Sequence, residues 1–153
     1  MDKELYIVNE GNMTSYKHKV QYYETDKMGI VHHSNYIRWM EEARVDFLEK
    51  ISWSYDQLEK VGLVSPVLSL DIDYLHPSFF GDVISIDVVI MELKMSKMRV
   101  GYKMTNEEGK VVAKCESSHG FLLSSGRPAI LKRDFPGLYE ALLTHLSIEK
   151  ESI

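Results

Sequence analysis

One change in the spacing of apolar residues constrains the fold of this chain more than any other feature of the sequence. From Asn35 onward, apolar residues recur every three or four positions, the spacing of an amphipathic helix of about four turns that ends near Lys50. Its apolar members are Tyr36, Trp39, Met40, Ala43, Phe47 and Ile51. On both sides of this helix the spacing changes to two, which is typical of strands with one buried face. The sequence therefore predicts an α+β fold in which the helix buries its apolar stripe on one face of an antiparallel sheet.

Strand-like alternation occurs in five segments, one before the long helix and four after it. These segments are residues 16–23, 68–74, 82–93, 98–104 and 111–123. We expect the side chain of Ser34 or Asn35 to cap the long helix, and Ser54 to cap a short helix that Gly62 ends. Leucines at helical spacing predict a C-terminal helix over about residues 137–150.

Length and composition limit the classes of protein to be considered. A chain of 153 residues predicts one domain over residues 1–153, with a core over about 15–130. The net charge of −5 argues against broad attraction to nucleic acid or to anionic membranes. The lone cysteine, Cys115, cannot form a disulfide within the chain, and no apolar run approaches the roughly 18 residues of a membrane span. A cytoplasmic protein without membrane insertion is expected.

The connection between the first strand and the long helix concentrates reactive side chains. A helix N-terminus presents unpaired N–H groups and a partial positive charge, which polarise a carbonyl oxygen and stabilise an oxyanion. Asp26 lies shortly before that terminus, and a carboxylate facing a polarised carbonyl can attack it or activate a water. Asp26, His32 and His33 could also bind zinc, but no His-x-x-x-His spacing supports a metal site. The pattern therefore favours acyl transfer without a metal.

A longer motif runs through this connection and into the helix. It consists of Asp26-x-x-Gly29-x-Val31-x-His33-x-Asn35-Tyr36, followed by Trp39-Met40-Glu41-Glu42-Ala43-Arg44. Later segments add Leu70-Asp71-Ile72-Asp73-Tyr74-Leu75-x-Pro77, Gly81-Asp82, Ser118-His119-Gly120-Phe121 and Gly126-Arg127-Pro128. Together they resemble hotdog-fold acyl-CoA thioesterases of the 4-hydroxybenzoyl-CoA thioesterase family over most of the chain.

That resemblance implies a fold, a reaction and a set of site residues. The fold is a hotdog, an antiparallel sheet wrapped around one long central helix, and the reaction is hydrolysis of an acyl-CoA without cofactor or metal. Asp26 is the catalytic carboxylate, as nucleophile or general base, and the His33 N–H polarises the thioester carbonyl while the His33 ring orients water or donates a proton. Substrate contacts are expected from Tyr23, Gly29, Val31, Ser34, Asn35, Tyr36 and Met40. Members of the family are dimers or dimers of dimers, so we expect a homodimer or homotetramer with each active site between subunits.

Other functions and residue roles stay open on the sequence alone. An acyl-carrier-protein thioesterase, a hotdog hydratase or dehydratase, and a non-catalytic acyl-CoA-binding module are the alternatives. Contacts to the CoA phosphates are expected from polar and basic residues, namely Ser96, Lys97, Arg99 and Arg127. Glu41 and Glu42 lie outside the apolar stripe and are expected on a solvated face, and Cys115 is interpreted as a small buried residue.

Overall fold

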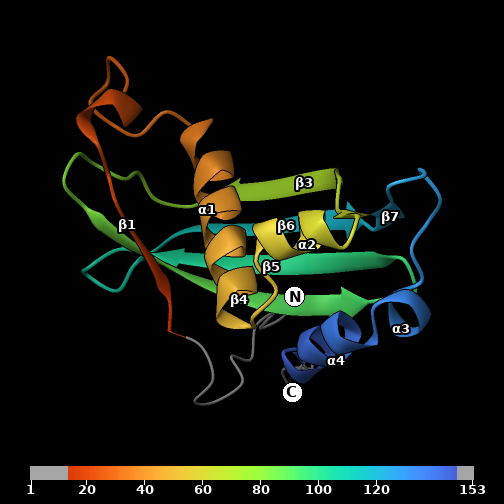
Figure 1. Cartoon of the computed structure of the whole chain (residues 1–153). Coiled ribbons are helices and arrows are strands. Elements are labelled where there is room, and N and C mark those ends of the chain that lie inside the picture. Colours follow the sequence, from red (N-terminus) through yellow and green to blue (C-terminus); the bar gives the residue numbers. More distant parts are fainter. Residues whose placement is uncertain (1–13, 148–153) are drawn as a thin grey trace.

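Helix α1 (Asn35–Lys50) crosses one face of a five-stranded antiparallel sheet in the computed structural model, which describes residues 14–147 (Figure 1). The sheet order is β1-β4-β5-β6-β3, with β1 (Tyr16–Lys19), β3 (Val67–Tyr74), β4 (Val83–Leu93), β5 (Lys97–Thr105) and β6 (Val111–Gly120). A small ladder joins β2 (Leu63–Val64) to β7 (Leu122–Leu123). The remaining helices are the 3-10 turn η1 (Tyr22–Glu24), α2 (Tyr55–Lys60), α3 (Leu131–Asp134) and α4 (Pro136–Thr144). The predicted α+β class and both ends of the long helix are confirmed.

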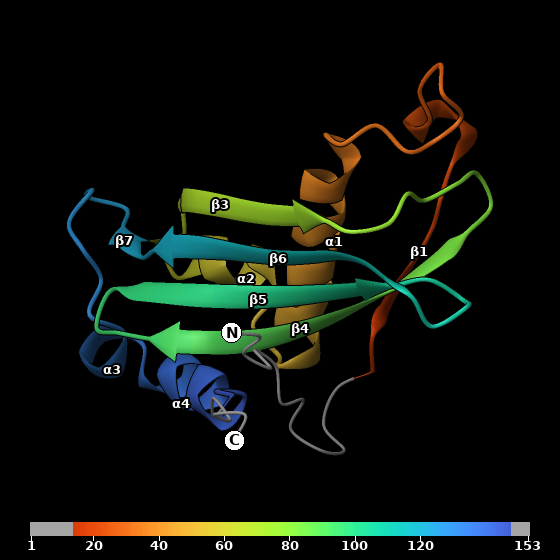
Figure 2. The same ribbon diagram turned by 180° about the vertical axis from the view of Figure 1, so that it is seen from behind.

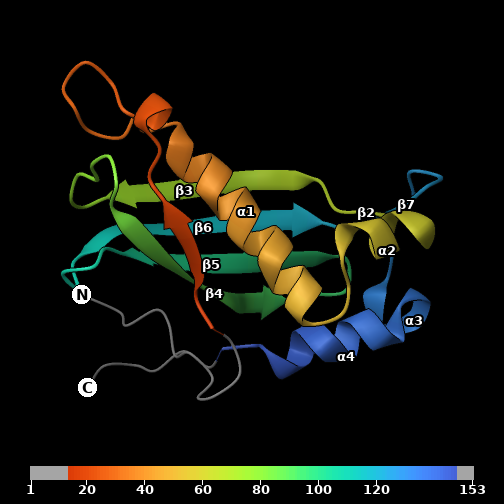
Figure 3. The same cartoon turned by 60° about the vertical axis from the view of Figure 1, so that its left-hand side comes forward.

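The core lies between α1 and the inner face of the sheet. Trp39, Met40 and Ala43 of α1 are almost completely buried, as are Ile86 of β4 and Tyr102 of β5. Burying each large apolar side chain contributes about 1.5–3 kcal/mol, which explains why the apolar stripe determines how the helix lies on the sheet. Figure 3 shows α1 running obliquely over the strands, with α2 beyond its C-terminal end and α4 along the β4 edge.

Strands β4, β5 and β6 form two successive hairpins, and β3 adds to the far side of β6. The register pairs Tyr102 with Cys115, and Tyr74 at the end of β3 with Ala113. Inward positions of β6 are buried, as the alternation predicts, including Cys115 and His119. Figure 2 shows the opposite face of the sheet, over which no helix of residues 14–147 lies.

Strand β3 differs from the prediction of one wet and one buried face. It is an edge strand that pairs with β6 on one side only, and side chains on both of its faces are exposed. Leu68 is 52% exposed, Leu70 42% and Tyr74 48%, although these residues alternate as core residues do. The chain therefore presents an edge strand whose apolar side chains, apart from the half-buried Ile72, are largely exposed among the described residues.

Three local predictions are wrong. The strand predicted over 16–23 ends at Lys19, because Glu24 turns inward and accepts the Gln21 N–H, which closes η1 and leaves Tyr22 and Tyr23 on the surface. No side-chain hydrogen bond caps α1, although Ser34 occupies the N-cap position.

The third error is the end of the C-terminal helix, because α4 stops at Thr144 and Leu146 instead forms a bridge with Ile90. Residues 148–150 of that prediction lie outside the described part of the chain. The short helix is as predicted, since the Ser54 hydroxyl accepts the Gln57 N–H.

Among residues 14–147, no helix is both long and apolar enough to cross a bilayer.

Candidate active site

A pocket of about 410 Å³ opens where the loop before α1, the start of α1 and the end of β3 meet. Its lining combines reactive groups with aromatic and apolar walls: Asp26, Met28, Ile30, Val31, His33, Tyr36, Tyr74, Leu75, His76 and Pro77. Four of these residues, Asp26, Val31, His33 and Tyr36, are among those that the motif singled out. The pocket therefore brings the expected carboxylate and the helix N-terminus to one cavity.

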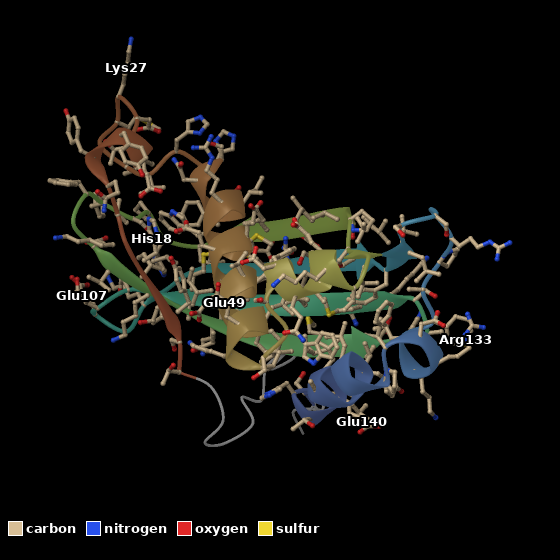
Figure 4. All side chains as sticks on the ribbon, viewed as in Figure 1. His18, Lys27, Glu49, Glu107, Arg133 and Glu140 are labelled. Carbon is tan, nitrogen blue, oxygen red and sulfur yellow. The ribbon has the colours of Figure 1, made fainter. Side chains whose placement is uncertain are left out.

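The loop that carries Asp26 is a tight turn held by its own backbone. Thr25 and Val31 form an antiparallel bridge, and the Asp26 N–H donates to the Ile30 carbonyl at 2.8 Å. Gly29 closes the turn with φ of +79°, a left-handed conformation that residues with a side chain rarely adopt. Figure 4 shows Lys27 at the outer tip of this turn, pointing away from the sheet. The Gly29 of the motif thus has a clear conformational role and does not line the pocket.

The same turn orients the Asp26 carboxylate. Its Oδ1 accepts the Met28 N–H at 2.8 Å, a local turn in which an aspartate side chain bonds to the backbone two residues on. Within residues 14–147 its Oδ2 takes part in no hydrogen bond. One oxygen therefore anchors the side chain and leaves the other available to react.

The N-terminal turn of α1 supplies the opposite partner. Its first carbonyls are occupied, because the His32 carbonyl accepts the Asn35 N–H at 3.0 Å and the His33 carbonyl accepts the Tyr74 hydroxyl at 3.1 Å. The His33 N–H has no acceptor within the described part of the chain. The centroid of the His33 ring lies 4.2 Å from that of the tilted His32 ring and 6.3 Å from that of Tyr74, in an edge-to-face arrangement. A free N–H at a helix N-terminus is suited to polarising a carbonyl oxygen.

Tyr36 and Tyr74 form the aromatic wall of the pocket, with ring centroids 5.2 Å apart in an edge-to-face arrangement. The Tyr36 hydroxyl donates to Ser78 at 3.0 Å, and burial raises the pKa of this phenol. The Ser78 carbonyl in turn accepts the Val31 N–H at 2.8 Å, which joins the two loops around the pocket. Tyr36 therefore stays protonated near neutral pH and serves as a wall and a hydrogen-bonding group.

The other residues that the motif assigned to the substrate do not line this pocket. Tyr23 is 77% exposed on η1, and the Ser34 hydroxyl pairs with the His32 ring. Asn35 is buried and donates to the carbonyls of Glu24 and His32. Met40 is 1% exposed within the core. Asn35 and Met40 thus have structural contacts that account for them without a ligand.

Sequence reasoning missed the second wall of the pocket, residues 74–77. The segment comes after β3 in the chain, and it lies against the Asp26 loop through contacts distant in sequence, such as the bridge between Ile30 and Phe79 and the Val31 N–H bond to the Ser78 carbonyl. Its sequence signal was the Tyr74-Leu75-x-Pro77 motif, which was used to identify the family and not the site. Of the two adjacent glutamates on α1, Glu41 is exposed and Glu42 accepts the Tyr16 hydroxyl at 3.0 Å, as a structural role predicts.

The four candidates for CoA contacts lie at the other end of the sheet. Ser96 and Lys97 flank the start of β5, and Arg127 lies in an exposed turn near β7. The Arg99 guanidinium lies 3.3 Å from Glu116 and 3.9 Å from Glu92, so its charge is already paired. None of the four lines the pocket that contains Asp26.

Two further kinds of chemistry can be assessed from the described residues. Within residues 14–147, no group of three or more His, Cys, Asp or Glu side chains is arranged to hold a metal ion. Cys115 is 1% exposed, and burial raises the pKa of its thiol to about 12, so little reactive thiolate forms near neutral pH. Asp26 and His33, which line one pocket, are therefore the candidate reactive residues of this site.

Comparisons with known proteins identify the family of this chain. A profile of the Thioesterase-like superfamily matches residues 20–142. The Bacillus subtilis protein YneP, named provisionally as an acyl-CoA thioesterase, is 34% identical over 124 residues, or 80% of this chain and 90% of that protein. An Aquifex aeolicus protein named provisionally as an esterase is 38% identical over 104 residues, or 68% of this chain and 80% of that protein.

Solved structures agree as well. The DHNA-CoA thioesterase of Staphylococcus aureus superposes with a TM-score of 0.81 at 29% identity, covering 86% of this chain and 89% of that one. The hotdog fold that the motif implies is thereby confirmed.

Proposed function

We propose that this chain, which belongs to the Thioesterase-like superfamily, hydrolyses acyl-CoA thioesters to a free carboxylic acid and CoA. One observation carries the proposal: the open Oδ2 of Asp26 and the unpaired N–H of His33 belong to residues that line the same pocket. The names of relatives support the substrate class, since YneP is described as an acyl-CoA thioesterase and the Staphylococcus aureus protein as a DHNA-CoA thioesterase.

In the proposed reaction, the thioester carbonyl oxygen accepts a hydrogen bond from the His33 N–H. Asp26 then follows one of two routes. As a nucleophile, it attacks the carbonyl carbon, the C–S bond breaks, and water hydrolyses the resulting anhydride. As a general base, it takes a proton from a water that attacks the same carbon, and the C–S bond then breaks. Both routes consume one water and release the CoA thiol, and the His33 ring orients the water or supplies a proton.

Replacing Asp26 tests the function directly. Asp26→Asn keeps the shape of the side chain but removes its charge, so we expect kcat for thiol release to fall by at least about 100-fold with the melting temperature little changed. Asp56→Asn, at an exposed position in the first turn of α2, is the matched control and retains activity. Hydrolysis by Asp26→Asn within a few-fold of the parent would contradict the proposal.

The same assay separates the alternative functions. A panel of short, long and aromatic acyl-CoAs is tested beside acyl-carrier-protein thioesters, with thiol release and enoyl absorbance followed in parallel. We expect thiol release from CoA substrates. Enoyl formation without thiol release would indicate a hydratase, faster turnover of carrier-protein substrates would change the substrate class, and binding without turnover would indicate a binding module.

We also propose that a second copy of the chain completes the site by pairing along β3. A long apolar edge strand with exposed Leu68 and Leu70 is a ready template for another strand. Two-fold antiparallel pairing would place the Val67 end of one β3 beside the Tyr74 end of the other. Because Val67 pairs with His119, which in turn pairs with Met98, the Val67 end is also the end near Lys97. The distant Ser96, Lys97, Arg99 and Arg127 of one copy would then approach the pocket of the other.

Association is tested by analytical ultracentrifugation with a charged substitution on β3. Leu70→Lys should shift the chain from a dimer or tetramer toward the monomer and reduce thioesterase activity in parallel. Leu143→Lys places the same charge on an exposed position of α4, beside β4 and away from β3, and should change neither quantity. A parent chain that is monomeric and fully active at micromolar concentration would exclude this arrangement.

A further inference from the structure

Glu24 is a buried acid two residues before Asp26, and the mechanism described above does not use it. Its side chain and backbone together are 3% exposed, which is rare for a glutamate. A buried carboxylate is tolerated only where hydrogen bonds replace its lost hydration. The partners of Glu24 therefore indicate what the burial achieves.

The Glu24 carboxylate forms hydrogen bonds with groups from three parts of the chain. Its Oε2 accepts the Trp39 indole N–H at 2.7 Å, from the second turn of α1. Its Oε1 accepts the Gln21 N–H at 2.8 Å and lies 2.7 Å from His18 Nε2 of β1. The His18 ring also packs on Trp39 with centroids 4.7 Å apart, and Figure 4 shows it beside α1. One side chain thus connects β1, η1 and α1.

The Glu24 backbone makes a second connection to the beginning of α1. Its carbonyl accepts the His32 N–H at 2.8 Å and the Asn35 side-chain amide at 2.9 Å. These donors lie on either side of His33 in the chain. Since Glu24 also immediately precedes the Thr25–Val31 bridge, it is attached to both the Asp26 turn and the helix N-terminus.

The charge of Glu24 is maintained by these donors. Burial alone would raise the pKa of its carboxyl, but the hydrogen bonds from Gln21, His18 and Trp39 outweigh burial and hold the pKa below its usual value. His18 also faces Glu42, with Nδ1 3.5 Å from its carboxylate, and Tyr16 donates to the same Glu42 oxygen. The carboxylate of Glu24 is therefore ionised and fully engaged near neutral pH.

We infer that Glu24 is a positioning residue, which sets the Asp26 carboxylate relative to the His33 N–H by bonding the Asp26 turn to α1 at Trp39 and at residues 32–35. The inference rests on the proposed thioesterase function. Glu24 does not line the pocket and acts through Asp26 and His33. Because productive geometry at a reacting centre is demanding, a shift of about 1 Å in the turn can reduce turnover by about 100-fold.

The decisive experiment compares turnover with binding in Glu24→Gln. The amide keeps the shape but replaces one of the two acceptor oxygens by an NH2 group, so either the Trp39 N–H or the Gln21 N–H loses its acceptor and the junction loosens. We expect kcat for thiol release to fall at least tenfold at 15 °C, where the variant is folded by circular dichroism, while KM stays within threefold of the parent. Ser117→Ala, which removes a buried hydrogen bond remote from the pocket, should lower the melting temperature and leave kcat unchanged.

A second variant keeps the test valid if Glu24→Gln does not fold. Trp39→Phe removes the indole N–H and retains an aromatic core residue, so kcat should fall in the same direction by a smaller factor. In the double variant the two losses should be less than additive, because both act through one contact. A lowered melting temperature with an unchanged kcat in either folded variant would overturn the positioning role. Failure of Asp26→Asn to lose activity would instead overturn the function itself.

Discussion

Two buried polar clusters lie against α1, and they differ in the completeness of their hydrogen bonding. The Glu24 cluster, formed by His18, Gln21, Glu24 and Trp39, adjoins the pocket, and both carboxylate oxygens of Glu24 have donors. The His119 cluster, formed by Arg44, Tyr102, Ser117 and His119, lies under the middle of the helix. There the buried Nδ1 of His119 has no hydrogen-bond partner among residues 14–147.

The clusters also differ in how completely their charged side chains are bonded. Arg44 is 7% exposed and donates to the Tyr55 hydroxyl at 3.2 Å, but no carboxylate within residues 14–147 forms an ion pair with it. Ser117 bridges the Tyr102 hydroxyl and His119 Nε2, each at 2.7 Å. The cluster near the chemistry is thus fully satisfied and rigid, whereas the remote one retains an unmet polar atom. Hydrogen bonding is thus more complete in the cluster that adjoins the pocket than in the cluster under the middle of the helix.

The largest effect expected from the difference between the clusters is that the His119 cluster makes the chain less stable in mild acid. Burial, together with the charge of Arg44, lowers the pKa of His119 to about 4, from 6.5 for an exposed imidazole. Between pH 6.5 and 4 the unfolded chain takes up a proton at this residue and the folded chain does not. The free energy of unfolding should therefore decrease as the pH falls, by up to about 3 kcal/mol over this range. Urea denaturation at several pH values measures it.

His119→Gln is the control for that experiment, because it keeps a group that can bond Ser117 and cannot titrate. Its stability should depend less on pH between 6.5 and 4 than that of the parent. Glu24 affects stability over a lower pH range. Because its pKa is reduced in the folded chain, its contribution to the free energy of unfolding is present above about pH 4.5 and decreases as the pH falls through the reduced pKa. An equal pH dependence in His119→Gln and the parent would show that the two clusters do not differ in this respect.

The smallest expected effect concerns Cys115, which lies two residues before Ser117 on β6 and faces the same core. Because burial raises the pKa of its thiol to about 12, the folded chain should react with a thiol reagent only at the rate of unfolding. Cys115→Ala should retain full thioesterase activity and lose some stability through the missing sulfur. Rapid labelling of the native chain, or inactivation by the reagent, would show that this part of the core is open.

Helix α1 could be predicted to the residue because its spacing, its polar start and its length all agree. The placement of Asp26 and His33 at one pocket could also be predicted, since they lie seven residues apart in one connection and the motif spans both. The end of β1 could not, because the strand stops where Glu24 turns inward to a tryptophan fifteen residues later. A short polar segment contains no local signal for such a distant contact.

The pocket wall at residues 74–77 was missed for a similar reason. These residues have the pattern of a strand end followed by a turn. They line the site because the segment folds back on the Asp26 turn, through the Ile30–Phe79 bridge and the Val31 N–H bond to the Ser78 carbonyl. The exposure of β3 could not be predicted either, because its apolar and polar residues alternate as they do in a covered strand. Local pattern describes which face is apolar, but it does not describe what covers that face.

The separation of the two walls of the pocket has a consequence for how such an enzyme can diversify. The reacting groups belong to one stretch of chain, residues 24–36, whose members are bonded to each other and to the core. The facing wall, Tyr74 to Pro77, belongs to another stretch that is exposed and makes few of these bonds. Substitutions at residues 75–77 can reshape the acyl site without removing a bond to the Asp26 carboxylate or to the helix terminus, whereas Tyr74 also bonds the His33 carbonyl. Natural selection and protein engineering can therefore change the preferred acyl group in one segment while the catalytic segment is inherited unchanged.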